Sequence, residues 1–390
     1  MRLHGKCVCD ISPDKMSDSI RKNSEIGMKK SNSNRRRVTL TDVARASGFS
    51  PSTVSLVVNE APLSRYIPAK TKQKIFDAVK RLGYRADIFA RSLRSQKSHM
   101  IGVLVIDLAD PYCTLILQGI ERKLLPTAYL PIVMDARNQL HQLERYLEMM
   151  VERRVEGLIT VPNWLLFDIA LLEDIDDRQI PTVVVGRDLE SPTINSVLVD
   201  NEAGGYAALE HLYQLGHREI AFLRGPRRMA DSRMRWKGIR SFAKEVGLKL
   251  NPALIRDLPG TVEPGSVFDG GLRVTKELLD SGEKFTAILA FDDLTAYGAI
   301  RVLAEAGRSV PESCSVIGFD DIPSAALTTP GLTTIRQPMA EMGEYAADYI
   351  LKHLEHGAED GVQPYGDTHT IVPQLVTRGS TAAIVKRPRK

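Results

Sequence analysis

The sequence predicts an α/β protein in which a small all-α helix-turn-helix head and a hinge helix precede a larger, two-lobed α/β body. Three observations lead to this prediction. Strand-like and helical patterns alternate between about residues 99 and 375, which is typical of βαβ units with a mostly parallel sheet. That stretch is long for a single sheet, so two lobes are expected. Ahead of it, residues 28–97 carry 16 Lys and Arg side chains against four acidic ones, although the whole chain has a net charge of only +4.

Composition narrows the class of protein. The chain has 390 residues, of which 43% are apolar and 26% are charged, the ordinary mixture of a globular protein. No apolar stretch reaches the roughly 18 residues of a membrane helix, and the first residues lack the apolar core of a signal peptide. We therefore expect a cytoplasmic protein without membrane contact. The four cysteines have the spacing of neither a disulfide framework nor a zinc site, so no metal and no cofactor is expected.

Five segments are expected along the chain. Residues 1–37 are polar and poor in aromatic side chains, which predicts a disordered basic extension. Translation beginning at Met28 would remove most of that extension. The head is expected over residues 38–84, the hinge or linker over 85–98, the body over 99–380 and a basic tail over 381–390.

Capping and turn residues in the head predict three short helices. Thr39 and Asp42 fit a capping box, and Gly48 permits a left-handed turn at the end of this first helix. Ser50 caps a second helix with Pro51 at its first position. In a helix-turn-helix the second helix enters the major groove of DNA. Its predicted solvent face consists of Pro51, Ser52, Thr53, Ser55, Leu56 and Asn59.

The body shows short apolar runs separated by amphipathic stretches. The expected strands are Met100–Leu108, Leu130–Met134, Val155–Val161, Thr182–Gly186, Ile220–Leu223, Ala287–Phe291 and Val316–Phe319. The expected helices include Leu140–Arg153, Ala207–Leu215, Leu272–Leu279, Leu294–Ala306 and Met339–Leu354. Ligands of such open sheets bind beyond the carboxyl ends of the strands.

Several motifs resemble one family along the whole chain. VTLTDVARASGFSPSTVSLVVNEAP and LGYRADIFARSLRSQKSHMIGVL look like the lac repressor (LacI/GalR) family of bacterial transcription regulators. LGHREIAFLRGP, ILAFDDLTAYGAIRVLAEAG, SVIGFDDIPSAALTTPGLTTIRQP and LVTRGST follow in the family's order, so the resemblance covers about residues 38–380. It implies a repressor that binds a pseudo-palindromic DNA operator as a homodimer. It also implies a periplasmic-binding-protein-like body that holds a small-molecule effector, a sugar, in the cleft between its lobes.

The resemblance assigns DNA contacts in the head and in the hinge. Pro51, Ser52 and Leu56 match positions that read base edges, and Leu56 departs from the Arg or His of many relatives, which predicts an apolar contact such as a thymine methyl group. The residues expected to hold phosphates or the fold are Thr39, Ser50, Thr53, Ser55 and Asn59. The loop 61–68 is longer than in relatives, and its Arg65 and Tyr66 either contact phosphates or are simply solvated.

The hinge segment carries ARSLR in the family's frame. Leu93 matches the wedge that unstacks the central base step in the minor groove, although its spacing alone favours a packing residue. Arg94 is expected to follow Leu93 into the groove, and Ala90 to allow close approach of the paired hinge helices.

The resemblance also assigns the effector site. Asp110 and Arg187 are expected to bind polar groups of the ligand, while Tyr112 either stacks on it or packs in the core. Arg235 matches the family arginine that grips the effector with a planar fork of donors, and Asp293 matches the family carboxylate. Two weaker candidates are Trp164 and Glu263. The charged neighbours Asp231 and Arg233 are expected on the surface, and Asp320 is expected to shape a crossover.

Two other classes of protein, a sugar-binding protein and an enzyme, agree less well with the sequence. A sugar-binding protein without a DNA role would not need the basic head. An enzyme would need a nucleophile, a base or a phosphate loop, and none has the required spacing, so no catalytic residue is expected. Within the regulators, a nucleobase that acts as co-repressor is the alternative to a sugar.

Overall fold

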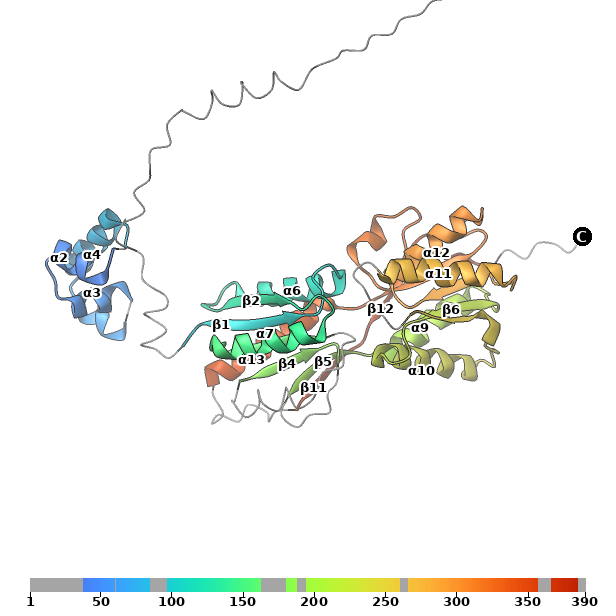
Figure 1. Cartoon of the computed structure of the whole chain (residues 1–390), viewed down its shortest axis with the longest axis horizontal. Coiled ribbons are helices and arrows are strands. Elements are labelled where there is room, and N and C mark those ends of the chain that lie inside the picture. The colour runs from blue at the N-terminus through green and yellow to red at the C-terminus, as the bar shows by residue number, and fades with distance from the viewer. Residues whose placement is uncertain are drawn as a thin grey trace, which may run out of the picture. The chain divides into compact units, whose positions relative to one another are not determined.

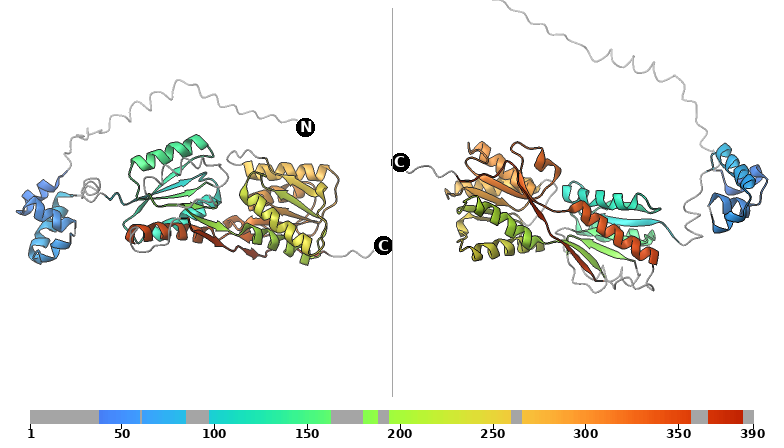
Figure 2. Two further views of the ribbon diagram at one scale, coloured as in Figure 1. Left: turned by 90° about the horizontal axis from the view of Figure 1, so that it is seen from below. Right: turned by 180° about the vertical axis from the view of Figure 1, so that it is seen from behind.

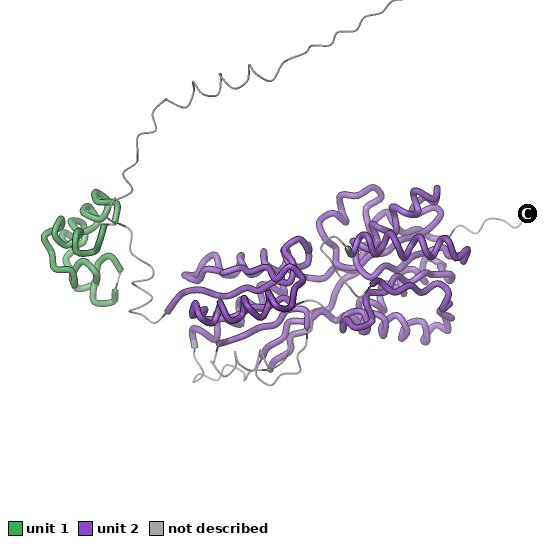
Figure 3. The backbone as a smooth tube through the Cα atoms, in the orientation of Figure 1, with its two compact units in different colours: residues 1–94 green, residues 95–390 purple. Residues whose placement is uncertain are grey.

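A computed structural model describes residues 38–59, 61–84, 97–162, 180–187, 194–259, 266–356 and 366–384. The chain divides into two compact units, residues 1–94 and 95–390 (Figure 3). The predicted extension 1–37, most of the predicted hinge and the last residues of the predicted tail lie outside the described residues. None of the described helices is long and apolar enough to cross a membrane.

The head consists of short helices around one small core. Its elements are α2 (Leu40–Ser47), α3 (Pro51–Val58), the 3₁₀ helix η2 (Pro62–Tyr66) and α4 (Ala69–Leu82). The capping box of Thr39 and Asp42 is present, and Gly48 ends α2 with φ = 77° in the left-handed region, as predicted. The fully buried side chains of the core are Val43, Ala44, Val54, Val57, Ile75 and Ala78.

The body contains two six-stranded sheets, which define lobe 1 and lobe 2 (Figure 1). The sheet of lobe 1 is parallel in the order β11-β5-β4-β3-β1-β2, and that of lobe 2 runs β12-β10-β9-β8-β6-β7 with only β12 antiparallel. The strands of lobe 1 are β1 (Met100–Val105), β2 (Leu130–Asp135), β3 (Gly157–Val161), β4 (Thr182–Val185), β5 (Asn195–Val199) and β11 (Thr368–Ile371). Those of lobe 2 are β6 (Ile220–Arg224), β7 (Ile255–Asp257), β8 (Ala287–Ala290), β9 (Ser315–Asp320), β10 (Thr333–Arg336) and β12 (Gln374–Val376).

Helices cover both faces of each sheet, as the alternating pattern predicted (Figures 1 and 2). In lobe 1, α6 (Pro111–Leu124) and α13 (Met339–His356) pack on one face and α7 (Leu140–Glu152) on the other. In lobe 2, α9 (Asn201–Gln214) and α10 (Ala230–Glu245) cover one face, and α11 (Ser266–Asp280) and α12 (Asp293–Glu305) cover the other. The two short 3₁₀ helices of this lobe are η3 (Pro252–Leu254) and η4 (Pro323–Ala326).

Glycines allow paired helices to approach closely. A Cβ at Gly205 of α9 would collide with the backbone of Arg235, and a Cβ at Gly238 of α10 would collide with the backbone of Glu202. Gly205 therefore serves the packing of α9 against α10, whereas Gly204 leaves room for the ring of Phe319 on β9.

The chain passes between the lobes three times. The first crossing joins β5 to α9, the second joins β10 to α13, and the third joins β11 to β12. The amide of Asp200 in the first crossing donates to the carbonyl of Ile371 in the third at 2.9 Å. These crossings hold together the two lobes that the sequence predicted.

The folded body extends past the predicted boundary at residue 380. The amide of Ala382 donates to Ser315 Oγ at 3.0 Å, and the amide of Ile384 donates to the carbonyl of Leu215 at 2.9 Å. Residues 381–384 thus belong to lobe 2, because their backbone groups are paired with it.

Candidate functional sites

Helix α3 is the candidate DNA-reading element of the head. Ser50 caps it, since Ser50 Oγ accepts a hydrogen bond from the amide of Thr53 at 3.2 Å. Val54 and Val57 turn into the core and fix the rotation of the helix about its axis. The side chains left exposed on this helix and its caps are Ser50, Pro51, Ser52 and Asn59.

Three residues predicted on the same solvent face are less accessible. Thr53 and Leu56 are half-buried, and Ser55 is only 9% exposed, with its hydroxyl accepting a hydrogen bond from Asn59 Nδ2 at 3.1 Å. The expectation of a solvent-exposed Ser55 is wrong. Three elements, α2, α4 and η2, contact α3 and leave it a narrower solvent face than its sequence pattern indicated.

Of the other predicted DNA contacts, one is a capping residue of α2 and three are not among the residues that the structure describes. Thr39 is exposed, and its Oγ1 donates to Asp42 Oδ2 at 2.7 Å within the capping box. Ala90, Leu93 and Arg94 lie outside the described residues. The long loop after α3 forms η2, where the guanidinium of Arg65 donates to Tyr66 Oη at 2.8 Å and 70% of Tyr66 is exposed.

In the body, polar side chains from both lobes gather around Tyr112. We call this group the inter-lobe cluster; its members are Asp110, Tyr112 and Arg187 of lobe 1 and Asn201, Asp231, Arg235, Asp292 and Asp320 of lobe 2. The ring of Tyr112 is 9% exposed, and a Cβ at Gly186 would lie 2.5 Å from its Oη. Burial and the nearby carboxylates of Asp231 and Asp320 raise the pKa of Tyr112, while Arg235 lowers it. The phenol is therefore a neutral hydrogen-bonding group.

Asp110 begins α6 at the edge of this cluster. Its Oδ1 accepts a hydrogen bond from the amide of Tyr112 at 2.9 Å, which fixes the carboxylate over the end of the helix. Burial raises the pKa of Asp110 to about 6, against the hydrogen bond from Tyr112, and Asp292 and Asp107 raise it further. Because Asp292 belongs to lobe 2, the two lobes present carboxylates to each other here.

Asp231 is a member of the cluster that the sequence analysis placed on the surface. Its Oδ1 accepts a hydrogen bond from Asn201 Nδ2 at 3.2 Å. Burial raises the pKa of Asp231, against the nearby charges of Arg235 and Arg187, which lower it. Asp231 lies one helical turn before Arg235 on α10, and this spacing alone could have placed both on one face. Arg233 is exposed, as expected.

Arg235 is 7% exposed and is largely bonded to protein groups. Its Nε donates to Asn201 Oδ1 at 2.8 Å and its Nη1 donates to the carbonyl of Phe291 at 2.6 Å. The guanidinium lies over the ring of Phe319, 3.6 Å from the centroid, and its Nη2 is 3.9 Å from Asp320 Oδ1. These contacts lock the fork in one orientation, so Nη2 is the part of it that can face a ligand.

The structure places Asp293, the predicted ligand carboxylate, in the interior of lobe 2. Asp293 is fully buried, with Oδ2 accepting from the amide of Ile322 at 2.9 Å and Oδ1 from Thr334 Oγ1 at 2.5 Å. It fits there because Gly318 has no side chain, and a Cβ at Gly318 would collide with Asp293. The neighbouring Asp292 instead joins the cluster, as the N-cap of α12.

Two further predicted ligand residues, Trp164 and Glu263, lie outside the described residues. Among the residues that the structure describes, no three His, Cys, Asp or Glu side chains are arranged to hold a metal ion.

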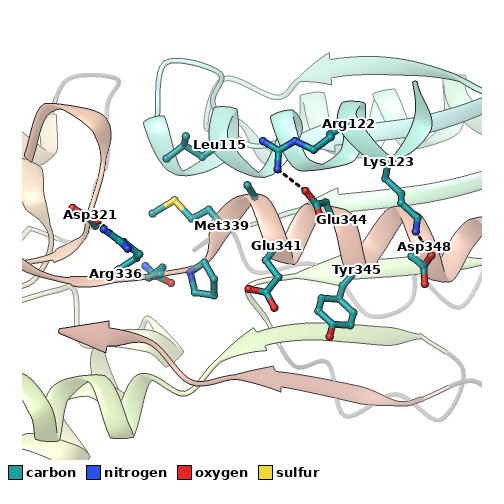
Figure 4. A pocket seen from close by; sticks show the side chains of 13 residues that line it. Leu115, Arg122, Lys123, Asp321, Arg336, Met339, Glu341, Glu344, Tyr345 and Asp348 are labelled. Atoms are coloured by element: carbon teal, nitrogen blue, oxygen red, sulfur yellow. Dashed lines mark hydrogen bonds and ion pairs between the residues drawn. The ribbon is translucent and has the colours of Figure 1, made fainter. Parts of the chain in front are cut away.

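A broad groove of about 770 Å³ runs along α6 and α13 of lobe 1 (Figure 4). Its charged walls are paired with each other, Arg122 with Glu344 at 2.6 Å and Lys123 with Asp348. Arg336, the last residue of β10, and Gln337 of the second crossing also line the groove. None of the predicted effector residues lines it.

A helix-turn-helix head joined to a two-lobed body with polar side chains from both lobes defines the class of ligand-responsive DNA-binding regulators. The comparisons with known proteins agree with this class. Residues 39–87 match the model of bacterial regulatory proteins of the lacI family, and residues 209–381 match that of the periplasmic binding protein-like domain. The chain is 32% identical over 350 residues to the HTH-type transcriptional repressor PurR of Haemophilus influenzae (strain PittEE), an alignment that covers 89% of this chain and 99% of the relative.

The solved structures that resemble this chain are also transcriptional regulators. The lac repressor dimer bound to operator and the anti-inducer ONPF superimposes with a TM-score of 0.77 at 28% identity, covering 89% of this chain and 100% of the repressor chain. The complex of the transcriptional regulator CelR with cellobiose gives 0.64 at 26% identity and covers 88% of this chain and 100% of that chain. The protein belongs to the lacI family of bacterial regulatory proteins and is a DNA-binding transcriptional repressor of that family.

Proposed function

We propose that this repressor binds a pseudo-palindromic operator as a homodimer and that a small molecule, a sugar, controls it from the inter-lobe cluster. The observation that carries the proposal is the meeting of Asp110, Tyr112 and Arg187 of lobe 1 with Asp231, Arg235 and Asp292 of lobe 2. A ligand bound by both lobes favours one lobe arrangement over another, and such differential binding is what allosteric control requires.

The DNA-binding half of the proposal assigns roles within the head and the hinge. Pro51, Ser52 and Leu56 contact base edges. Phosphates or the fold are held by the capping residues Thr39, Ser50 and Asn59 and by Thr53 and Ser55 within α3. In the hinge, Leu93 is the minor-groove wedge, with Ala90 and Arg94 beside it. Two-fold symmetry of a homodimer then matches two half-sites of the operator.

The chemistry of the cluster supports a sugar. Carboxylates of Asp110, Asp231 and Asp292 accept hydrogen bonds from hydroxyl groups, the phenol of Tyr112 both donates and accepts, and Arg187 donates. CelR, whose fold this chain shares, is solved with cellobiose. A nucleobase co-repressor is the alternative, because its ring N–H groups would satisfy the same carboxylates.

A thermal-shift screen of the purified chain tests the effector. The panel contains ribose, cellobiose, other mono- and disaccharides, sugar phosphates, hypoxanthine and guanine. A ligand at 100 times its Kd stabilises the folded state by about 2.7 kcal/mol, so binding raises the melting temperature measurably. We expect a sugar to do so, and we expect the shift to disappear in Asp292→Asn and Arg187→Ala.

The matched control is Glu305→Gln, which alters an exposed ion pair with Arg301 in the same lobe and leaves the cluster intact. The control keeps the full shift. A shift produced by hypoxanthine or guanine and by no sugar would replace the sugar with a nucleobase. Shifts that survive Asp292→Asn and Arg187→Ala would place the effector elsewhere.

A further inference from the structure

Arg235 is bonded to the first crossing between the lobes. Asn201, which accepts the hydrogen bond from Arg235 Nε, is the first residue of α9 and directly follows the crossing from β5. The same Asn201 side chain donates to the carbonyl of Val199, the last residue of β5, at 3.3 Å. The guanidinium therefore holds the point at which the chain enters lobe 2.

Asp320 connects Arg235 to the second crossing. Its Oδ1 is 3.9 Å from Arg235 Nη2 and accepts a hydrogen bond from Gln337 Nε2 at 2.5 Å. The amide of Gln337 also donates to the backbone carbonyl of Asp320 at 3.1 Å. Gln337 directly follows β10, at the start of the segment that returns the chain to α13 of lobe 1. Arg235 thus reaches both crossings, one through Asn201 and the other through Asp320.

The backbone at Asp320 is held in an unfavourable conformation. Its φ of 123° lies in a region that side-chain-bearing residues rarely adopt. The next residue, Asp321, has φ = 60° and is held by ion pairs with Arg336 and Arg378, both at 2.6 Å. Ion pairs to Asp321 and the hydrogen bond from Gln337 to Asp320 hold this turn beside the second crossing.

We propose that Asp320 and Gln337 are positioning residues that, together with Arg235, transmit the state of the inter-lobe cluster to the crossings and so set the angle between the lobes. This inference rests on the proposed function, in which the cluster is the effector site. The effector faces Nη2 of Arg235, the atom that also faces Asp320. Ligand groups placed there compete with Asp320 for the guanidinium and change its hold on Gln337.

The lobe angle can be measured without any ligand by double electron–electron resonance on the full chain. Spin labels are placed on Glu148→Cys of α7 and Lys276→Cys of α11, which are exposed positions on different lobes. Cys113 and Cys314 are buried and stay unlabelled, while the two cysteines of the N-terminal extension are removed as Cys7→Ser and Cys9→Ser. Dilution with unlabelled chain leaves one labelled subunit in each dimer.

The test compares Asp320→Asn and Gln337→Leu with the same background. Asp320→Asn keeps an acceptor for Gln337 and replaces the carboxyl group that faces Arg235 with an amide, whereas Gln337→Leu removes the donor and leaves Arg235 and Asp320 in place. We expect both to shift or broaden the inter-lobe distance distribution by several ångströms. The double variant shifts it no further than the larger single effect, because both changes break one link. Glu305→Gln, on the exposed face of α12, leaves it unchanged.

Distance distributions of Asp320→Asn and Gln337→Leu that superimpose on the parent would overturn the proposal, provided that circular dichroism shows folded protein. If Asp320→Asn does not accumulate as folded protein, Gln337→Leu carries the test alone. Because the distances are measured without a ligand, their outcome does not depend on the result of the effector screen. A screen without a hit contradicts the proposed effector and leaves the distances untouched.

Discussion

Val54→Ala tests whether the head is stabilised by its own small core. Val54 of α3 is fully buried and is one of the six buried side chains of this core, and the substitution removes two methyl groups from it. At about 0.8 kcal/mol for each buried carbon, the transfer cost is about 1.6 kcal/mol, and the cavity left behind raises the total to about 2–3 kcal/mol. A folded unit as small as this head has a total stability of only about 2–7 kcal/mol.

Hydrogen exchange read by mass spectrometry on the full chain is the assay, because it reports the head and the body separately. A loss of about 2–3 kcal/mol accelerates exchange of the α3 and α4 amides by about 30- to 150-fold. Peptides from β1 and α6 of the body keep the wild-type rate. Val58→Ala is the matched control, since Val58 lies on the same helix but is only half-buried, and its effect is smaller. Unchanged exchange in α4, or an equal acceleration in β1, would refute the reasoning.

Four further predictions concern single features. Ser50→Ala removes the cap of α3 and costs about 1 kcal/mol, which appears as about fivefold faster exchange of the α3 amides, and an unchanged rate would contradict the capping role. Gly205→Ala forces α9 away from the backbone of Arg235 and costs about 1–3 kcal/mol in denaturant unfolding of the body; a neutral effect would mean that the helices separate freely. Burial raises the pKa of Asp293 to about 7, against its hydrogen bonds, so folded protein retains a proton that the unfolded chain loses near pH 4. The contribution of Asp293 to the free energy of unfolding therefore falls as pH rises from about 4 to 7. Over this range the free energy of unfolding in urea should fall less in Asp293→Asn than in wild type, and parallel curves would contradict this. Operator affinity falls steeply between low and high salt, measured by fluorescence anisotropy, because bound phosphates release counterions, and a flat salt dependence would argue against contacts from the basic head.

The alternation of patterns predicted the layered fold because long, buried strands such as β1 and β3 leave strong apolar signals. The strands it missed are short or lie toward sheet edges: β7 has three residues, and β10 reads TTIR, with too few apolar side chains to stand out. Helix α6 was not among the expected helices, although its polar residues Thr114, Gln118 and Glu121 recur at helical spacing.

The candidate sites could be predicted only where local spacing determines which way a side chain points. Caps such as Thr39 and Ser50 follow from neighbours three residues away, and the structure confirms both. The choice between Asp292 and Asp293 depends on Gly318 and Thr334, which approach only when the sheet of lobe 2 is assembled. Asp231 and Asn201 are likewise joined across two helices, a contact that no local pattern encodes.

The most direct test of the account measures operator affinity with and without the effector. A selected operator duplex is titrated with the full-length protein at fixed salt, first alone and then with a saturating concentration of the sugar that gives the largest thermal shift. The account predicts that the sugar changes the operator Kd by about 5- to 150-fold, the range of a typical allosteric coupling, and that Arg187→Ala abolishes the change. Identical operator Kd values with and without a bound sugar would contradict the claim that the inter-lobe cluster controls the head.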